Sequence, residues 1–342
     1  MEISGRKIGS NFPPLIIAEI GINHGGSLEV AKEMVRSAAL AGCEMVKHQT
    51  HIVEDEMTVE AKNIYPPNAN VSIWDVIEQC ALSKKDEAEL KRYSEQLGLI
   101  WISTPFSRAA VDFLEELDVP AYKIGSGEVD NLPLIRYIAS KGKPIIMSTG
   151  MQTIESIRSS VQILESANID YALLECTNLY PSPPEIVSLK GIVELREAFP
   201  SARIGFSDHS IGATMALASV ALGACIVERH YTDTRYRNGP DIINSMDPVE
   251  LMYTISRSKE IWLAANNPKK RSHAEESVYA FARSSVVADR DLPVGHKITE
   301  SDIWARRPGS GEIAGFEFDR VVGKVLKRHV IKNTQLSWID FE

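Results

Sequence analysis

The stretch RIGFSDHSIGATMALASVALGACIVERH, residues 203–230, decides the fold of this chain. It holds two apolar strand-like runs, 203–209 and 225–230, on either side of a helix-like segment, and the runs end in His209 and His230. Strands that alternate with helices predict βα units and a parallel sheet. The carboxyl ends of parallel strands meet at one edge of such a sheet, so we expect the two imidazoles to lie close together.

Six further strand-like runs precede this pair, and each ends beside a polar or charged residue. They are LIIAEI (15–20), EMVKHQ (44–49), LIWIST (99–104), AYKIGS (121–126), PIIMST (144–149) and YALLECT (171–177). Eight strands with intervening helices predict a closed (β/α)8 barrel, a TIM barrel, in which all strand ends open onto one mouth. The strands are apolar along most of their length, as expected where both faces are covered. We therefore expect the active site at that mouth.

The chain of 342 residues is long enough for this barrel and a smaller second domain. The barrel is predicted over 1–266, a charged linker over 267–278, and a small C-terminal domain over 279–342. This last part has short strand-like runs, turn signals and a small helix that begins at Thr299. The segment 53–81 is longer than an ordinary connection, and we expect it to pass over the barrel mouth.

Composition and charge exclude several classes of protein. Hydrophobic residues make up 44% and charged residues 24%, which is typical of a globular domain. The formal net charge of −9 argues against nucleic acid or an anionic membrane as a partner. No apolar run reaches the roughly 18 residues that span a bilayer. The first residues lack a signal-peptide core and the four cysteines show no CxxC spacing, so a cytoplasmic location is expected.

His209 and His230 are the first candidates for chemistry. Two imidazoles on adjacent strands would suit a divalent cation that keeps open positions for water and substrate. The alternative is a pair of histidines that cap the barrel rim through ordinary hydrogen bonds.

Lys47 and Lys123 end the second and fourth strands. A lysine there can be a Schiff-base nucleophile, a ligand for phosphate or carboxylate, or a solvated rim charge. Hydroxyl side chains and the backbone N–H groups of the turn Gly125–Gly127 lie around the same circle of strand ends. Together with the lysines they favour a cradle that binds an anion. The hydroxyls are those of Thr104, Ser126, Ser148 and Ser207.

Glu19 and Glu128 follow the first and fourth strands. Each carboxylate can orient a sugar hydroxyl, act as a general base on water, or pair with a lysine. Asp241 lies in a Gly-Pro loop beyond the eighth strand, where ligand loops are common. The weaker candidates are His24, His48 and His51.

Several multi-residue strings occur in one fixed order along the chain. They are KHQTHIVEDEM (47–57), STPFSRAA (103–110), YKIGSGE (122–128), STGM (148–151), SDH (207–209), ERH (228–230), GPDI (239–242) and WARRPGSG (304–311). Together they closely resemble the bacterial sialic acid synthases, or N-acetylneuraminate synthases, over nearly the whole chain. The C-terminal domain is similar to the antifreeze-like (SAF) domain of that family.

The resemblance implies a condensation of phosphoenolpyruvate with N-acetylmannosamine and water, giving N-acetylneuraminate and phosphate. Alternative sugars are N-acetylmannosamine 6-phosphate and a diacetamido hexose of the legionaminate or pseudaminate type. The loop 236–239 and the string SDHSIGATMALA (207–218) depart from the pattern of the family, which leaves the sugar open. The competing hypotheses are a lysine Schiff-base pyruvate aldolase and a sugar-binding barrel without turnover.

The resemblance also implies a role for particular residues. His209 and His230 would hold a divalent metal, with Mn²⁺ expected and Mg²⁺ or Co²⁺ as alternatives. Glu128 would be the base near the reacting carbons. Phe281 and Arg307 would reach the sugar bound by the other subunit of a domain-swapped homodimer. The sugar contacts in the barrel would be Glu19, Tyr180 and Asp241. The contacts to phosphoenolpyruvate would be Lys47, Thr104, Lys123, Ser126, Ser148, Asn178 and Ser207.

Overall fold

The computed structural model describes residues 1–66, 70–239 and 241–342, so Pro240 of the Gly-Pro loop lies outside the described residues. The chain forms two compact units, Met1–Asn267 and Pro268–Glu342. Part of the segment expected to be a linker is helical. It contains η4 (His273–Glu275) and the beginning of α11 (Glu276–Ala282).

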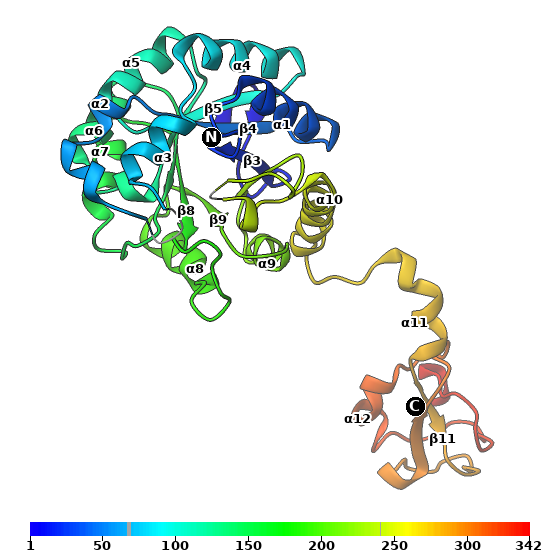
Figure 1. Ribbon diagram of the computed structural model, residues 1–342. Helices are drawn as coiled ribbons and strands as arrows, with labels where there is room; N and C mark the ends of the chain where they lie inside the picture. The colour runs from blue at the N-terminus through cyan, green and yellow to red at the C-terminus, as the bar shows by residue number, and fades with distance from the viewer. Residues whose placement is uncertain (67–69, 240) are drawn as a thin grey trace. The chain divides into compact units, whose positions relative to one another are not determined.

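Eight parallel strands of the first unit close into a barrel in the order β10-β3-β4-β5-β6-β7-β8-β9, which confirms the predicted TIM barrel (Figure 1). Each strand overlaps one of the predicted runs. They are β3 (Leu15–Gly21), β4 (Met45–Thr50), β5 (Ile100–Pro105), β6 (Tyr122–Ile124), β7 (Ile145–Ser148), β8 (Tyr171–Cys176), β9 (Arg203–Asp208) and β10 (Ile226–His230). The ladder between β10 and β3 closes the barrel and sets His230 opposite Glu19.

Helices surround the barrel (Figure 1). The Ser27 hydroxyl caps the first by accepting a hydrogen bond from the Val30 N–H, and Ser83 caps α4 in the same way. Gly42 follows the first helix with φ +84°, a left-handed conformation that glycine adopts without strain. The helices are α1 (Leu28–Leu40), α4 (Lys84–Gln96), α5 (Arg108–Glu116), α6 (Leu132–Ala139), α7 (Arg158–Ser166), α8 (Leu189–Ala198), α9 (Thr214–Ala221) and α10 (Pro248–Ala265).

Side chains alternate between two layers along each barrel strand, because the strand repeat is two residues. In β10, Ile226 packs inside the barrel, whereas Val227 packs in the layer under the helices. Glu228 and His230 continue the inward series that Ile226 begins. A hairpin of β1 (Glu2–Ile3) and β2 (Arg6–Lys7) adds Ile3 to the inner apolar cluster. Apolar residues thus fill one end of the barrel and polar residues the other.

The long segment after β4 contains α2 (Val53–Glu56), η1 (Val59–Asn63) and α3 (Ile73–Cys80). Val53, Trp74 and Ile77 form a small apolar cluster with Ile22, which lies in the loop after β3. The segment therefore packs against a loop at the carboxyl end of the barrel, which agrees with its predicted position at the mouth.

The second unit has its own apolar core, which includes Val286, Ile303 and Leu326. Its antiparallel strands are β11 (Ser285–Ala288) and β12 (Ile303–Arg306). Its short helices are η5 (Glu300–Asp302), η6 (Gly315–Glu317), α12 (Phe318–Val321) and η7 (Trp338–Asp340). Thr299 caps η5, as predicted.

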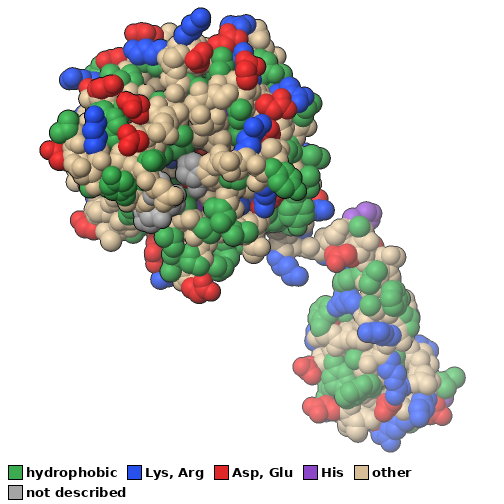
Figure 2. All heavy atoms as spheres, in the orientation of Figure 1, with side chains coloured by type: hydrophobic (Ala, Val, Ile, Leu, Met, Phe, Trp, Pro, Cys, Tyr) green, Lys and Arg blue, Asp and Glu red, His purple; other side chains and the backbone are tan. Residues whose placement is uncertain are grey.

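Charged side chains of both signs are interspersed on the face of the molecule that Figure 2 shows. In the described part of the chain, no helix combines the length and the apolar character needed to cross a membrane.

Candidate active site

A cavity of about 170 Å³ lies at the carboxyl ends of the barrel strands. Most of the predicted site residues come together in its wall, although they are far apart in the sequence. They are Glu19, Lys47, Thr104, Lys123, Ser126, Ser148, Asn178, Tyr180, Ser207, His209 and His230. All eight barrel strands or the loops that follow them contribute to this wall.

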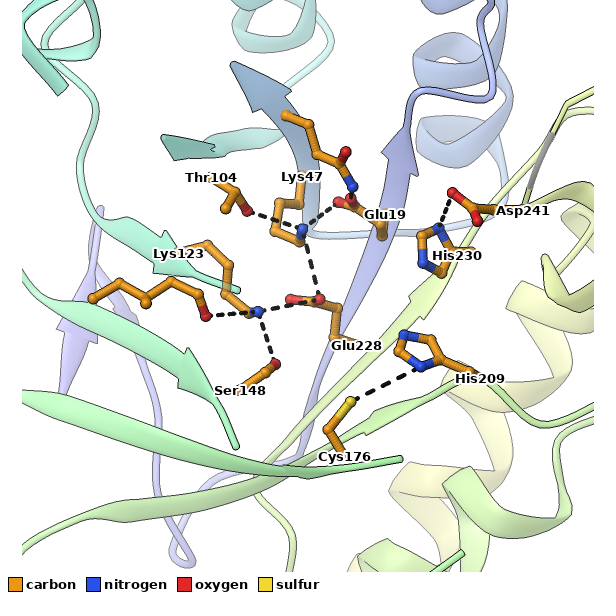
Figure 3. A network of polar contacts seen from close by, with 12 residues as sticks. Glu19, Lys47, Thr104, Lys123, Ser148, Cys176, His209, Glu228, His230 and Asp241 are labelled. Atoms are coloured by element: carbon orange, nitrogen blue, oxygen red, sulfur yellow. Dashed lines mark hydrogen bonds and ion pairs between the residues drawn. The ribbon is translucent and has the colours of Figure 1, made fainter. Parts of the chain in front are cut away.

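Lys47 lies at the centre of a buried polar network (Figure 3). Its Nζ lies 2.7 Å from Glu19 Oε2 and 3.6 Å from Glu228 Oε1, and it donates to Thr104 Oγ1 at 3.2 Å. Burial raises the pKa of Glu19 to about 7, although Lys47 acts in the opposite direction. Burial by itself would lower the pKa of Lys47, but the two facing carboxylates raise it above its ordinary value. Lys47 is therefore a fixed cation.

Lys123 extends the network on the other side of Glu228. Its Nζ donates to Ser148 Oγ at 2.8 Å and lies 3.6 Å from Glu228 Oε1. Burial lowers the pKa of Lys123, which the Glu228 carboxylate partly offsets. Burial tends to raise the pKa of Glu228, but Lys123 and Lys47 together hold it below its usual value. One ionised carboxylate thus lies between two amino groups in the cavity wall.

Hydroxyl and amide groups complete the cradle beside Lys123. Ser126 begins η2 (Ser126–Glu128), and its Oγ accepts a hydrogen bond from the Gly150 N–H at 2.9 Å. A Cβ atom at Gly150 would lie 2.1 Å from Asn178 Oδ1, so a larger residue there would displace the Asn178 side chain. The ammonium groups and hydroxyls of this wall are suited to binding a phosphate or a carboxylate.

His209 follows β9 and His230 ends β10, with their ring centroids 5.4 Å apart. The ring of Tyr180 stacks on His209 at 4.1 Å between centroids. Burial lowers the pKa of both histidines to about 3, so both imidazoles are neutral at neutral pH. His209 Nδ1 lies 2.9 Å from the Thr177 carbonyl oxygen, which can only accept. His209 therefore carries its proton on Nδ1, and the lone pair of Nε2 is left for a ligand.

These two histidines fit a divalent cation by the chemistry of their donor atoms. In the described residues, His230 Nδ1 is buried without a hydrogen-bond partner, and Asp241 Oδ2 lies 3.6 Å from it. Burial raises the pKa of Asp241 to about 6. Over residues 1–66, 70–239 and 241–342, no three His, Cys, Asp or Glu side chains converge as a metal cage. The protein would thus supply two imidazoles and leave other positions to water or substrate.

Four predicted residues are not among those that line this cavity, namely Asp241, which lies beside His230, and Glu128, Phe281 and Arg307. Glu128 ends η2, and its Oε2 accepts a hydrogen bond from Asn131 Nδ2 at 2.7 Å. Burial raises the pKa of its carboxyl group. Phe281 lies in α11 and Arg307 follows β12, so both belong to the second unit, where both are exposed.

Sequence reasoning did not single out Glu228, Gln49 or Cys176 as site residues, yet all three line the cavity. Gln49 Nε2 donates to Glu19 Oε1 at 2.8 Å. Cys176 donates to Asn178 Oδ1 at 3.1 Å, and burial raises its pKa to about 12. The available signal was alternation, because Glu228 precedes His230 by two residues and so shares its inward face.

The weaker histidine candidates are held by other side chains outside the cavity lining. His48 lies between Lys47 and Gln49 in the sequence. Its side chain points away from the cavity that these two residues line. Its Nδ1 lies 3.2 Å from Glu87 Oε1, and its Nε2 lies 3.2 Å from Nε2 of His24. His51 Nδ1 lies 2.8 Å from Glu56 Oε2. The three imidazole rings therefore contact other side chains around the barrel mouth and do not line the cavity.

Comparison with known proteins gives matches over the whole chain. The model of the NeuB family matches residues 34–270, and that of the SAF domain matches residues 283–342. The chain is 34% identical to the N,N'-diacetyllegionaminic acid synthase of Legionella pneumophila, over 99% of both chains. It is 35% identical to the N-acetylneuraminate-9-phosphate synthase of Homo sapiens, over 96% of this chain and 91% of that protein.

A solved structure is similar as well. The crystal structure of an N-acetylneuraminic acid synthetase from Leptospira borgpetersenii in complex with citrate superposes with a TM-score of 0.75. The two chains are 29% identical, and the match covers 81% of this chain and 94% of that one.

Proposed function

This chain belongs to the NeuB family of sialic acid synthases and carries a SAF domain, and we propose that it condenses phosphoenolpyruvate with N-acetylmannosamine and water. The products are N-acetylneuraminate and phosphate. The observation that carries the proposal is the buried row of Glu19, Lys47, Glu228 and Lys123 beside two neutral imidazoles. It offers anion binding and a cation site in one cavity.

Lys47 and Lys123 are proposed to bind the carboxylate and phosphate of phosphoenolpyruvate, with Thr104 and Ser148 as further donors. Their ammonium groups already contact carboxylates, and these contacts keep both amines aimed into the cavity. Binding one substrate in this fixed position makes the reaction with the sugar effectively unimolecular. Such positioning can lower a barrier by roughly 7–11 kcal/mol.

His209 and His230 are proposed to hold the divalent cation, Mn²⁺ with Mg²⁺ and Co²⁺ as alternatives. When bound, such an ion supplies Lewis acidity that polarises a carbonyl group, here the aldehyde of the open-chain sugar. Tyr180 stacks on His209 and keeps its ring in place. Asp241 lies beside His230, where its carboxylate can accept hydrogen bonds from sugar hydroxyls.

In the proposed reaction the methylene carbon of phosphoenolpyruvate forms a bond with the aldehyde carbon. The π electrons of the aldehyde move to its oxygen, which takes up a proton and becomes a hydroxyl group. The carbon that bears the phosphate ester becomes electron-poor, water adds to it, and its bond to the ester oxygen then breaks to release phosphate. A carboxylate must take the proton of that water. Glu128 is proposed as this base, as the resemblance implies, because burial raises the pKa of its carboxyl group. The two lysines hold the pKa of Glu228 below its usual value, which makes Glu228 the weaker base.

The sugar is the least constrained part of the proposal, because relatives of similar identity are named for different products. N-acetylmannosamine 6-phosphate and diacetamido hexoses remain the alternatives. Arg307 of the partner subunit in a domain-swapped homodimer is proposed to contact the acyl group of the sugar, and Phe281 of the partner subunit is proposed to reach the same sugar. This assignment rests on the resemblance of their motifs to the family.

One observation favours a second candidate, a Schiff-base pyruvate aldolase. Burial lowers the pKa of Lys123, which increases the fraction of its amine that can attack a carbonyl carbon. This enzyme would use pyruvate, release no phosphate and be trapped by borohydride.

A screen for phosphate release separates these alternatives. The full chain is incubated with Mn²⁺, phosphoenolpyruvate and one sugar at a time, namely N-acetylmannosamine, its 6-phosphate and diacetamido hexoses. We expect the fastest release with N-acetylmannosamine. A faster reaction with another sugar would revise only the substrate. Absence of release with every sugar, together with borohydride trapping of pyruvate on Lys123, would overturn the proposed function.

A further inference from the structure

Asp208 and Arg229 each directly precede one of the two histidines of the cavity, His209 and His230. They face each other in the parallel ladder between β9 and β10. Because side chains alternate along a strand, both point away from the cavity that the histidines line. Each residue is only 1% exposed. A buried ion pair thus lies directly behind the histidine pair.

The guanidinium of Arg229 joins three parts of the barrel. Its Nε lies 3.2 Å from Asp208 Oδ2 on β9, and one terminal nitrogen donates to the Ser210 carbonyl oxygen at 2.9 Å. The other terminal nitrogen donates to Glu250 Oε1 at 2.6 Å. Glu250 lies in the first turn of α10, and its N–H donates to the capping carboxylate of Asp247. The contacts connect β10 to β9, to the loop after β9 and to α10.

This arrangement is poorly explained as a source of stability. Burying ions costs desolvation energy, and an apolar replacement of similar volume is often as stable. The neighbouring outward residues Ile204, Phe206 and Val227 are apolar core residues of this kind. The best-attested use of a buried ionic group is to fix one register. A slip of one residue would turn each side chain of β10 to the opposite face, so Arg229 would enter the cavity and His230 would leave it.

We propose that Asp208, Arg229 and Glu250 form a clamp that sets the spacing and orientation of the two imidazoles. The three are positioning residues, because they act through the backbone of His209 and His230. The inference rests on the proposed function, in which these histidines hold a divalent cation. The clamp therefore determines the affinity for that cation.

Binding of Mn²⁺ alone to the metal-free full chain tests the clamp. Electron paramagnetic resonance measures free Mn²⁺ during a titration and gives the dissociation constant. Asp208→Asn keeps the shape of the side chain but removes its charge, and we expect the dissociation constant to rise about 10-fold or more, as for other groups that orient metal ligands. Glu250→Gln, at the more exposed end of the clamp, should raise it several-fold.

Glu115→Gln is the matched control. Glu115 is also a carboxylate of an outer helix; it lies 2.9 Å from Lys143 Nζ and accepts a hydrogen bond from Tyr122, which begins β6 away from the mouth. The dissociation constant for Mn²⁺ measured with Glu115→Gln should equal that of the wild type. If Asp208→Asn lowers the melting temperature without weakening Mn²⁺ binding, the pair is only structural and the clamp is refuted.

If Asp208→Asn does not fold, unchanged Mn²⁺ affinity in Glu250→Gln refutes the clamp instead. A wild-type protein that binds no Mn²⁺, Mg²⁺ or Co²⁺ would overturn the metal site itself, and the clamp with it. The two failures are therefore distinguishable.

Discussion

Oε2 of Glu19 lies 2.7 Å from Nζ of Lys47, and both side chains are buried in the wall of the barrel. The two residues are opposite each other in the ladder between β3 and β4. The pair holds a cation inside the barrel before any substrate is present. The backbone register fixes both residues inside the barrel. If one charge is removed, the other therefore stays buried without a counter-ion and without water to solvate it.

The first prediction concerns Lys47→Met, which leaves the carboxylates of Glu19 and Glu228 facing each other. Breaking a buried pair typically costs about 3–5 kcal/mol, and we expect that loss in urea unfolding at pH 8. Burial raises the pKa of Glu19 to about 7 while Lys47 acts to lower it, so loss of Lys47 raises this pKa further. Glu19 is then protonated at pH 5, which removes the repulsion, and the loss should be smaller there. Lys190→Met is the control; it breaks an exposed pair with Glu194 and should leave the free energy of unfolding nearly unchanged. Equal losses at the two pH values would contradict this account.

The second prediction compares Glu228→Gln with Glu128→Gln in steady-state kinetics. Loss of a general base lowers turnover by about 10²–10⁴-fold, and we expect this for Glu128→Gln, with phosphoenolpyruvate still bound. Glu228→Gln removes a charge that lies 3.6 Å from the Nζ atoms of both lysines, so it should change the KM for phosphoenolpyruvate more than it changes turnover. A larger fall in turnover for Glu228→Gln than for Glu128→Gln would give the role of base to Glu228.

The third prediction concerns the metal. Replacement of His209 or His230 by Ala should abolish turnover while circular dichroism shows an intact fold. Chelation of the wild type should do the same, and added Mn²⁺ should restore activity. Full turnover after exhaustive chelation would refute the assignment of both histidines.

The sequence predicted the eight strands because each is an apolar run bounded by helix signals, and it brought most cavity residues to one mouth through topology alone. It missed Glu228 because only the residue at the strand end, His230, was singled out, and the alternation that puts Glu228 on the same face was not applied. It placed Glu128 beside the cradle because Glu128 follows Gly127 directly. The short helix η2 sets that carboxylate next to Asn131, directly after Gly127, which lines the cavity. Cys176 was missed because a thiol gives the same signal in a cavity wall as in an apolar core.

The fourth prediction concerns acid stability. Burial lowers the pKa of His24 to about 3 from an ordinary value of 6.5. The unfolded chain therefore binds one more proton between these values, and stability that is complete above pH 6.5 is lost as the pH falls toward 3. His24→Asn should make the fall in unfolding free energy shallower by up to about 1.4 kcal/mol per pH unit. An unchanged slope in His24→Asn would contradict the assignment.

The fifth prediction concerns Arg307. Arg307→Ala should raise the KM for the sugar far more than that for phosphoenolpyruvate, because a guanidinium suits a fixed contact with the acyl carbonyl. Mixed with His209→Ala protein under subunit exchange, it should regain some activity. No recovery in demonstrated heterodimers would mean that Arg307 does not act in the partner subunit.

The most direct test of the central claim is mass spectrometry of the products formed from phosphoenolpyruvate and N-acetylmannosamine in H₂¹⁸O. The account predicts N-acetylneuraminate that carries ¹⁸O at the carbon that bore the phosphate ester, and unlabelled phosphate, because water adds to carbon and the ester oxygen leaves with phosphorus. Label in the phosphate, or phosphate release without a condensed sugar acid, would contradict it.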